Sequence, residues 1–158
     1  MSMPKPRRLT LDGEQATAEL AAEIASLAED GDVIALSGEL GTGKTTFARA
    51  FLREWGVQEE IPSPTFTLVQ TYELEAGTVW HFDLYRLEKP DDALELDIED
   101  AFTEGISLIE WPERLGAYLP WERLDLHFVI GEREDVRRVE IEGTDEWVDR
   151  LKELEGLG

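Results

Sequence analysis

A glycine-rich segment directly after an apolar run is the feature that most constrains the fold of this chain. Residues 38–45 read Gly-Glu-Leu-Gly-Thr-Gly-Lys-Thr and follow the apolar residues 33–36. This order predicts a buried strand, a tight phosphate-binding turn (a Walker A loop) and a helix that begins near Lys44. Glycine lets successive backbone N–H groups converge on one anion, and the helix N-terminus adds partial positive charge. The pattern therefore predicts that Lys44 reaches the β- and γ-phosphates of a nucleotide and that the Thr45 hydroxyl can ligate Mg²⁺.

The residues expected to contact nucleotide phosphates belong to this turn and to the start of the following helix. Their backbone N–H groups, one ammonium and the threonine hydroxyls suit phosphate oxygens and a bound Mg²⁺ ion. The chain contains no Asn, so it lacks the Asn-Lys-x-Asp loop with which GTPases read guanine, and ATP is favoured over GTP. The expected phosphate-contacting residues are Glu39, Leu40, Gly41, Thr42, Gly43, Lys44, Thr45 and Thr46.

Hydrophobic periodicity predicts strands and helices on both sides of the loop. Apolar residues at helical spacing predict a helix between Asp12, its expected N-cap, and Gly31. Two pairs of β-rich runs each predict a hairpin. We therefore expect an α/β, P-loop NTPase-like three-layer fold with a mixed, partly antiparallel sheet, in one domain over residues 1–158. The expected strands are 7–11, 32–37, 66–74, 78–84, 106–109, 124–130 and 136–141, and the other expected helices are 44–55, one or two within 90–102, one ending near 119 and a last one after Thr144.

Composition narrows the class of protein. The formal net charge is −21, from 36 acidic and 15 basic residues. Such a surface repels nucleic-acid backbones, so strong direct nucleic-acid binding is not expected. The excess of acidic residues is interpreted as a solvated surface or, alternatively, as an adaptation to a high-salt source. The chain has no Cys, no apolar stretch near 18 residues and no secretory leader, so we expect a soluble, cytoplasmic protein without membrane spans or thiolate metal sites.

Two acidic residues end apolar strand patterns and are candidates for a magnesium site. Asp83 ends the run Val-Trp-His-Phe-Asp, and Glu110 ends the run Ile-Ser-Leu-Ile-Glu. Nucleotide hydrolysis needs a metal ion, a group that orders water and a sensor of the γ-phosphate. Either carboxylate alone could be a solvent-facing strand end, but two of them beside a phosphate loop favour a functional interpretation. The segment 63–65, Ser-Pro-Thr, has the position of a switch with Thr65 as the sensor, or it is a proline-stiffened turn.

Several other residues are weaker candidates for a functional role than these carboxylates. His81 and His127 lie in strand patterns and are expected to be packed or surface histidines rather than ligands. Trp111 follows the second carboxylate, where its ring either covers the site or meets a partner. Arg86 is the nearest candidate for an arginine finger, and no arginine is an obvious one in cis. We therefore expect slow nucleotide turnover by the chain alone and faster turnover with a partner.

Four segments together resemble the TsaE family, the small bacterial ATPases of the tRNA threonylcarbamoyladenosine (t6A) pathway. The resemblance runs in register from about Leu11 to about Val139, which is most of the chain, and four motifs in matching order make it specific. The heavy acidity and the low Lys content depart from the family but leave every motif intact. The four segments are GELGTGKTT at 38–46, SPTFTLV at 63–69, HFDLYRL at 81–87 and IEWPER at 109–114.

The resemblance implies a role for each matching residue. Lys44 and its loop would hold the phosphates of ATP, and Thr45 with Glu110 would hold Mg²⁺. Asp83 would lie close to the γ-phosphate and be needed for hydrolysis, by positioning water or through the outer ligands of the metal. Thr65 would be the switch that faces the γ-phosphate.

The resemblance also implies where the base lies and which proteins are the partners. Trp111 would lie near the nucleotide, and adenine contacts would come from Asp12, Gly13 and Arg138, on position alone. Family members support the TsaD transferase, working with TsaB, which moves a threonylcarbamoyl group onto adenosine 37 of tRNA. ATP turnover by this chain would reset that assembly between rounds, and the partner would be the main holder of RNA.

Two other functions stay open at the level of the sequence. A small-molecule or nucleotide kinase usually has a basic acceptor pocket, whereas residues 88–104 after the Asp83 strand are acidic. A nucleotide sensor without hydrolysis would need neither of the two acidic candidates nor the switch. The sequence therefore favours an ATP-hydrolysing protein.

Overall fold

Seven strands form one sheet in the computed structural model, which describes residues 7–39, 42–62, 64, 67–133 and 136–152. In chain order they are β1 Arg7–Asp12, β2 Val33–Gly38, β3 Val69–Leu74, β4 Gly77–Asp83, β5 Ile106–Glu110, β6 Leu124–Ile130 and β7 Val136–Gly143.

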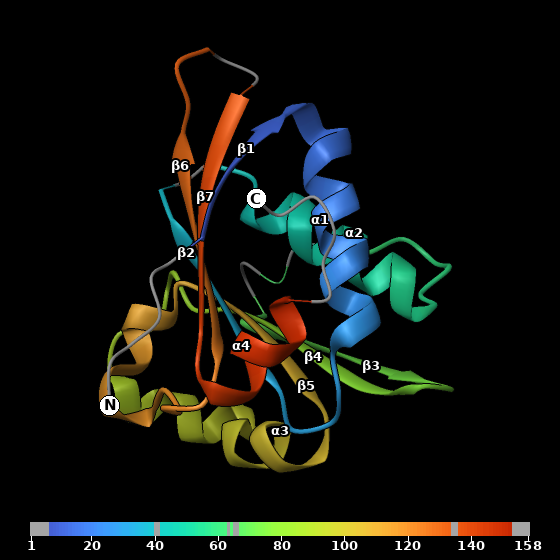
Figure 1. Ribbon diagram of the computed structural model, residues 1–158. Helices are drawn as coiled ribbons and strands as arrows, with labels where there is room; N and C mark the ends of the chain where they lie inside the picture. The colour runs from blue at the N-terminus through green and yellow to red at the C-terminus, as the bar shows by residue number, and fades with distance from the viewer. Residues whose placement is uncertain (1–6, 40–41, 63, 65–66, 134–135, 153–158) are drawn as a thin grey trace.

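The sheet is mixed, with a parallel centre and antiparallel edges. Its strand order is β1-β7-β6-β2-β5-β4-β3. The strands β6, β2, β5 and β4 are parallel, whereas β1 and β7 on one side and β3 on the other pair antiparallel (Figure 1). The apolar residues 33–36 of β2 are all buried, as expected for a strand with neighbours on both sides and helices on both faces. The carboxyl ends of the parallel strands consequently meet at one edge of the sheet.

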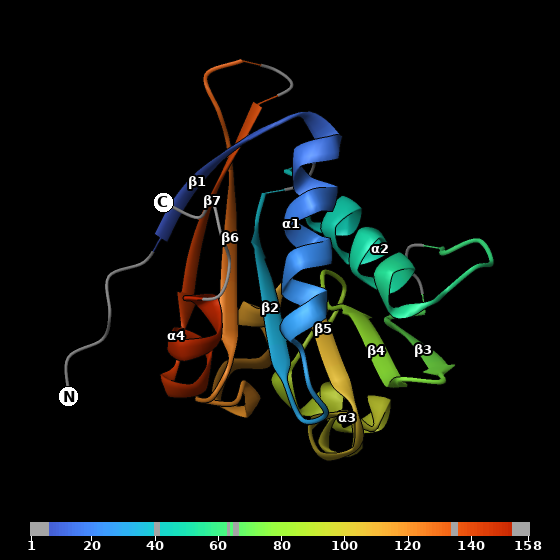
Figure 2. The same ribbon diagram turned by 45° about the vertical axis from the view of Figure 1, so that its right-hand side comes forward.

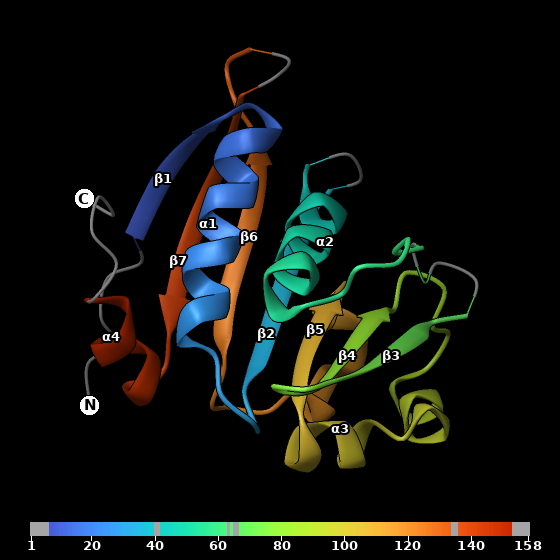
Figure 3. The same ribbon diagram turned by 90° about the vertical axis from the view of Figure 1, so that its right-hand side faces the viewer.

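Helices cover both faces of the sheet. The long helices α1 and α2 lie side by side on one face (Figures 2 and 3), where Ile24 of α1 and Phe47 and Phe51 of α2 are fully buried. The opposite face of β2, β4 and β5 packs against η1, α3 and η2 through residues such as Phe82 and Ile109. This arrangement confirms the predicted three-layer α/β fold with a mixed, partly antiparallel sheet. The helices are α1 Gly13–Leu27, α2 Lys44–Trp55, α3 Ile98–Glu104 and α4 Asp145–Leu151, and the 3₁₀ helices are η1 Pro90–Leu96 and η2 Pro112–Tyr118.

Some element boundaries differ from the sequence prediction. Helix α1 ends at Leu27 rather than near Gly31, because the Asp32 carboxylate accepts a hydrogen bond from the Glu29 backbone N–H at 2.7 Å and closes a turn there. The N-cap of α1 is Asp12, as predicted, but its side chain makes no capping hydrogen bond. The element before residue 119 is a 3₁₀ helix. In the described part of the chain, no helix has the length and apolar character that crossing a bilayer requires.

Candidate functional site

The glycine-rich loop begins at the end of β2 and is packed tightly against β6. Gly38 has φ +130°, and a Cβ at this position would lie 2.4 Å from the backbone oxygen of Phe128. Only glycine fits such a contact without moving backbone. On the far side of the turn, Thr42 Oγ1 donates to the Glu39 carbonyl at 2.6 Å and draws the two sides of the loop together. Of the expected phosphate-contacting residues, Leu40 and Gly41 lie outside the described residues.

Lys44 begins α2 and its ammonium is held inside the loop. Gly43, with φ +107°, precedes it in the left-handed conformation that the turn into the helix requires. The Lys44 side chain donates to the Gly38 carbonyl, and its Nζ lies 3.5 Å from the centre of the Trp111 ring. Burial lowers the pKa of Lys44, while the negative charges of Glu110, Glu113 and Asp83 act in the opposite direction. The loop therefore places a desolvated cation at the carboxyl end of β2.

The hydroxyl of Thr45 and the carboxylate of Glu110 are in direct contact. Thr45 Oγ1 donates to Glu110 Oε1 at 2.8 Å. Glu110 ends β5, where it is the register partner of Leu36 in β2, and it is only 2% exposed. The neighbouring parallel strand therefore carries this carboxylate to the first turn of α2, and two hard oxygen atoms lie side by side next to Lys44.

Asp83 lies beside Glu110 at the end of the next parallel strand. The two residues are register partners between β4 and β5, and Asp83 is 6% exposed. Its backbone N–H donates to the Leu68 carbonyl at 2.9 Å, and its Oδ1 accepts from the Tyr85 N–H at 3.1 Å. Because both carboxylates are buried, neither is a solvent-facing strand end. The two acidic residues singled out in the sequence are thus brought together at the edge that bears the phosphate loop.

The histidines have contacts that the sequence analysis did not predict. His81 is fully buried, as a packed histidine would be, but its Nε2 lies 2.7 Å from Glu110 Oε2. The spacing places His81 on the same face of its strand as Asp83, two positions on, but it does not tell that Glu110 lies on the neighbouring strand. His127 of β6 is exposed, and its Nδ1 lies 2.8 Å from Ser37 Oγ at the end of β2.

Two residues next to the carboxylates have an unusual backbone conformation. Trp111, directly after Glu110, has φ +62°, and Leu68, whose carbonyl holds Asp83, has φ +67°. Non-glycine residues in this region cost about 1–3 kcal/mol each and gather at functional sites. At Trp111 the conformation turns the indole toward Lys44 and toward the Tyr85 ring, whose centre is 4.9 Å away.

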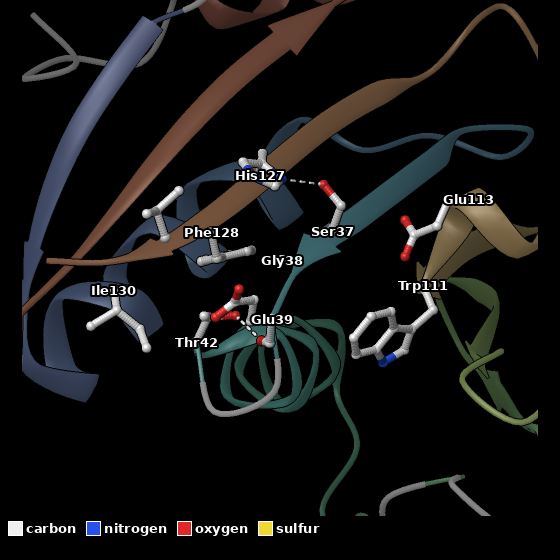
Figure 4. A pocket seen from close by; sticks show the side chains of 10 residues that line it. Ser37, Gly38, Glu39, Thr42, Trp111, Glu113, His127, Phe128 and Ile130 are labelled. Atoms are coloured by element: carbon white, nitrogen blue, oxygen red, sulfur yellow. Dashed lines mark hydrogen bonds between the residues drawn. The ribbon is translucent and has the colours of Figure 1, made fainter.

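A cavity of about 440 Å³ opens beside the loop. Figure 4 shows Phe128 and Ile130 on one side of the turn and Trp111 on the other. Mixed apolar and polar walls of this kind are typical of small-molecule sites. The lining residues are Ser37, Gly38, Glu39, Thr42, Trp111, Glu113, His127, Phe128, Val129 and Ile130.

The three residues expected to contact adenine are not among these lining residues. Asp12 pairs with Arg133 at 3.8 Å, and Gly13 is the first residue of α1. Arg138 of β7 is the register partner of Val129 in β6 and lines a second cavity of about 460 Å³. Their contacts with adenine stay a prediction. The expected γ-phosphate sensor, Thr65, lies outside the described residues.

The donor atoms present suit a nucleotide with magnesium. Magnesium in such sites takes one or two protein oxygens and completes its shell with phosphate oxygens and water. Thr45 Oγ1 and Glu110 Oε1 are a matching pair. Across the described ranges, no group of three or more His, Cys, Asp or Glu side chains forms a cluster that could hold a metal by itself. Lys44 and the start of α2 supply the positive charge that phosphates need.

Comparisons with known proteins agree on one family. The profile of the family described as threonylcarbamoyl adenosine biosynthesis protein TsaE matches residues 11–139. The tRNA threonylcarbamoyladenosine biosynthesis protein TsaE of Rickettsia felis is 42% identical over 106 residues, which are 66% of this chain and 62% of that protein. The protein of the same name from Aquifex aeolicus is 43% identical over 110 residues, or 68% of this chain and 78% of its own length. The chain thus spans about three fifths of the length of the Rickettsia felis relative.

A solved structure resembles nearly all of the chain. The crystal structure of YdiB from Bacillus subtilis has a TM-score of 0.81 and 27% sequence identity, and the match covers 97% of this chain and 95% of YdiB. The family profile spans the phosphate loop, both carboxylates and the strands that bring them together. The chain therefore belongs to the TsaE family of threonylcarbamoyl adenosine biosynthesis proteins.

Proposed function

We propose that this chain is a Mg²⁺-dependent P-loop ATPase that hydrolyses ATP to ADP and phosphate in support of t6A modification of tRNA. The observation that carries the proposal is the 2.8 Å contact between Thr45 Oγ1 and Glu110 Oε1, directly beside Lys44. This contact joins a hydroxyl at the start of the loop helix to a carboxylate from the neighbouring strand. Nucleotide-bound magnesium uses such a pair of oxygen ligands in P-loop enzymes.

Each residue of the site has a proposed task. Lys44 and the first N–H groups of α2 hold the β- and γ-phosphates, and Thr45 and Glu110 hold Mg²⁺. The bound ion supplies charge neutralisation on the phosphate oxygens. Asp83, buried beside Glu110, orders the attacking water or the outer ligands of the metal. Thr65 senses the γ-phosphate, and Asp12, Gly13 and Arg138 contact adenine.

The proposed partners are the TsaD transferase and TsaB. ATP turnover by this chain supports the catalytic turnover of TsaD and TsaB. The tRNA is held by the partner rather than by this chain, whose net charge is −21. Because the proposed function supports tRNA modification, we propose that the chain acts in the cytoplasm. Phosphoryl transfer to water is mainly a matter of positioning and charge stabilisation, so a partner that completes the site raises the rate. Hydrolysis by the chain alone is accordingly slow.

The first experiment measures binding and hydrolysis separately. In Glu110→Gln we expect kcat for phosphate release to fall about 100-fold or more, because a few kcal/mol of metal-based charge stabilisation are lost. The affinity for a non-hydrolysable ATP analogue without magnesium should stay within about threefold. Glu113→Gln is the matched control, since Glu113 lines the cavity but, in the described part of the chain, makes no hydrogen bond with Thr45. Equal losses of analogue binding and of turnover in Glu110→Gln would contradict the assignment of Glu110 as a magnesium ligand.

The second experiment tests the products and the partners. Purified chain should form ADP and free phosphate, and a phosphorylated acceptor in place of phosphate would mean a kinase. Pull-down with TsaD and TsaB in the presence of ATP, ADP or no nucleotide should show nucleotide-dependent association and faster phosphate release. Identical association under all three conditions, with no change in rate, would contradict the partner role.

A further inference from the structure

His81 makes its polar contact with the carboxylate of Glu110 and with no other group of the described residues. The ring lies on β4, fully buried, with Nε2 at 2.7 Å from Glu110 Oε2. The other ring nitrogen, Nδ1, is buried without a hydrogen-bond partner in the described part of the chain. Because a carboxylate oxygen only accepts, Nε2 carries the proton of this bond. The Nε2–H group of the ring is thus directed at one oxygen of Glu110.

The two oxygens of Glu110 are held by different elements of the fold. Oε2 is bonded to His81 from β4, and Oε1 accepts from Thr45 of α2. A carboxylate with one hydrogen bond can still rotate about its last side-chain torsion, whereas a bond to each oxygen fixes the plane of the group. His81 therefore orients the carboxylate so that Oε1 points toward the first turn of α2.

A role in packing alone does not account for this residue. His81 has apolar neighbours on its face of the sheet at Val79 of β4 and Leu108 of β5, although Asp83 of β4 shares that face. Burying an imidazole among such residues loses its hydration, and one hydrogen bond recovers part of this loss. An aliphatic side chain would fill the same space without that loss. The contact with Glu110 is the compensating feature.

We propose that His81 is a positioning residue, which holds the Glu110 carboxylate with Oε1 ready for a magnesium ion. The inference rests on the proposed magnesium-dependent function and assigns His81 a task within that site. Outer partners of this kind commonly change metal affinity or activity 10- to 100-fold, roughly, when they are removed. Loss of His81 therefore weakens metal binding by the loaded protein and leaves the phosphate loop itself intact.

The test uses three substitutions that differ in where they place a donor. The amide nitrogen of His81→Gln reaches about as far as Nε2, that of His81→Asn reaches only about as far as Nδ1, and His81→Leu has none. The full chain, saturated with a non-hydrolysable ATP analogue, is titrated with Mn²⁺, and free Mn²⁺ is followed by electron paramagnetic resonance. Mn²⁺ is chosen because it prefers the same oxygen ligands as Mg²⁺.

We expect the Mn²⁺ dissociation constant to rise about tenfold in His81→Leu and His81→Asn and to stay within about threefold of the parent in His81→Gln. Affinity for the analogue in EDTA should be unchanged in all three variants, and the melting temperature should not follow the order of metal affinity. Parent-like Mn²⁺ binding by folded His81→Leu would overturn the proposal. Equal loss in all three variants, in proportion to a loss of folded protein, would also overturn it.

The result of the His81 test can be distinguished from the result of the test of the proposed ATPase function. If the parent chain binds the analogue and Mn²⁺ but releases no phosphate with or without partners, the ATPase proposal fails, and the order of the three variants still decides the role of His81. If the loaded parent binds no Mn²⁺, the positioning role fails with the metal site.

Discussion

The two ends of β2 hold buried charges in different ways. At the amino end, Asp32 is bonded directly to Arg150 of α4, which also reaches Glu29 at 2.8 Å and Glu146 at 3.0 Å. At the carboxyl end, the Lys44 ammonium lies against a backbone carbonyl and an indole ring. The nearby carboxylate of Glu110 bonds to Thr45 and His81 instead.

The difference separates a structural ion cluster from a site prepared for a ligand. A cation that is hydrogen-bonded to carboxylates has little charge left for another anion. At the carboxyl end Lys44 and Glu110 attract one another through space but are hydrogen-bonded to other groups, so each can still bind a phosphate or a metal ion. Substitutions in the ion cluster at the amino end of β2 should therefore change the free energy of unfolding. Substitutions in the site at the carboxyl end of β2 should change ligand binding instead.

The largest expected effect is that of Lys44→Met on nucleotide binding. Loss of a charge-assisted contact to phosphate removes about 2–3 kcal/mol, so affinity for an ATP analogue should fall about 30- to 150-fold. The free energy of unfolding should stay within about 1 kcal/mol of the parent, because burial already disfavours the ammonium. Isothermal titration and urea unfolding measure the two quantities. Lys89→Met, at an exposed position, is the control. Parent-like affinity for the analogue in Lys44→Met would contradict the assignment of the carboxyl end of β2 as a ligand site.

The next effect is that of Arg150→Met on stability. This substitution leaves Asp32 buried without its cation and also removes the guanidinium, whose Cζ lies 4.6 Å from the centre of the Trp147 ring. We expect about 2 kcal/mol of destabilisation in urea, below the value for a fully buried pair because part of the cluster is exposed. Affinity for an ATP analogue should stay within about twofold. Lys152→Met removes an exposed pair on the same helix and should change stability by less than about 0.5 kcal/mol.

A smaller effect is expected from the backbone of Trp111. Trp111→Ala and Trp111→Gly both remove the ring from Lys44, and both should weaken nucleotide binding to the same extent. Only glycine accepts φ +62° without strain, so Trp111→Gly should be about 0.5–1 kcal/mol more stable than Trp111→Ala after its larger unfolded-state entropy is allowed for. Thermal unfolding of the two variants gives the comparison. A more stable alanine variant would mean that the observed conformation stores no strain.

The smallest expected effect is on the pH dependence of stability that arises from Asp32, at the amino end of β2. Desolvation raises the pKa of Asp32 above 3.8, although the hydrogen bond from Arg150 acts in the opposite direction. A raised pKa in the folded state means that the group contributes stability below pH 3.8, and this contribution is lost as the pH rises through the folded pKa. Without Arg150 the folded pKa rises further, so the same loss extends to higher pH. The stability gap between parent and Arg150→Met should therefore widen as the pH rises above the folded pKa of Asp32 in the parent, and a constant gap would place the effect of Arg150 in packing.

Much of the fold follows from local patterns. The loop helix was predicted over residues 44–55, which are its bounds, and both hairpins have the predicted pairing. Helix α1 is shorter than predicted because the Asp32 side chain reaches back to the Glu29 N–H, a contact that periodicity does not contain. The segment before residue 119 has the predicted location but is a 3₁₀ helix, which begins after the left-handed Trp111 and contains a non-helical Gly116.

The sequence by itself determined the phosphate loop, because its glycines, its lysine and the strand and helix around it are neighbours in the chain. It also indicated Asp83 and Glu110, since both end apolar strands. Only the tertiary structure decided that Glu110 meets Thr45, 65 residues away, and that His81 holds its other oxygen. These contacts depend on the order of strands in the sheet. Local periodicity tells which face of a strand is buried but not which strand lies beside it.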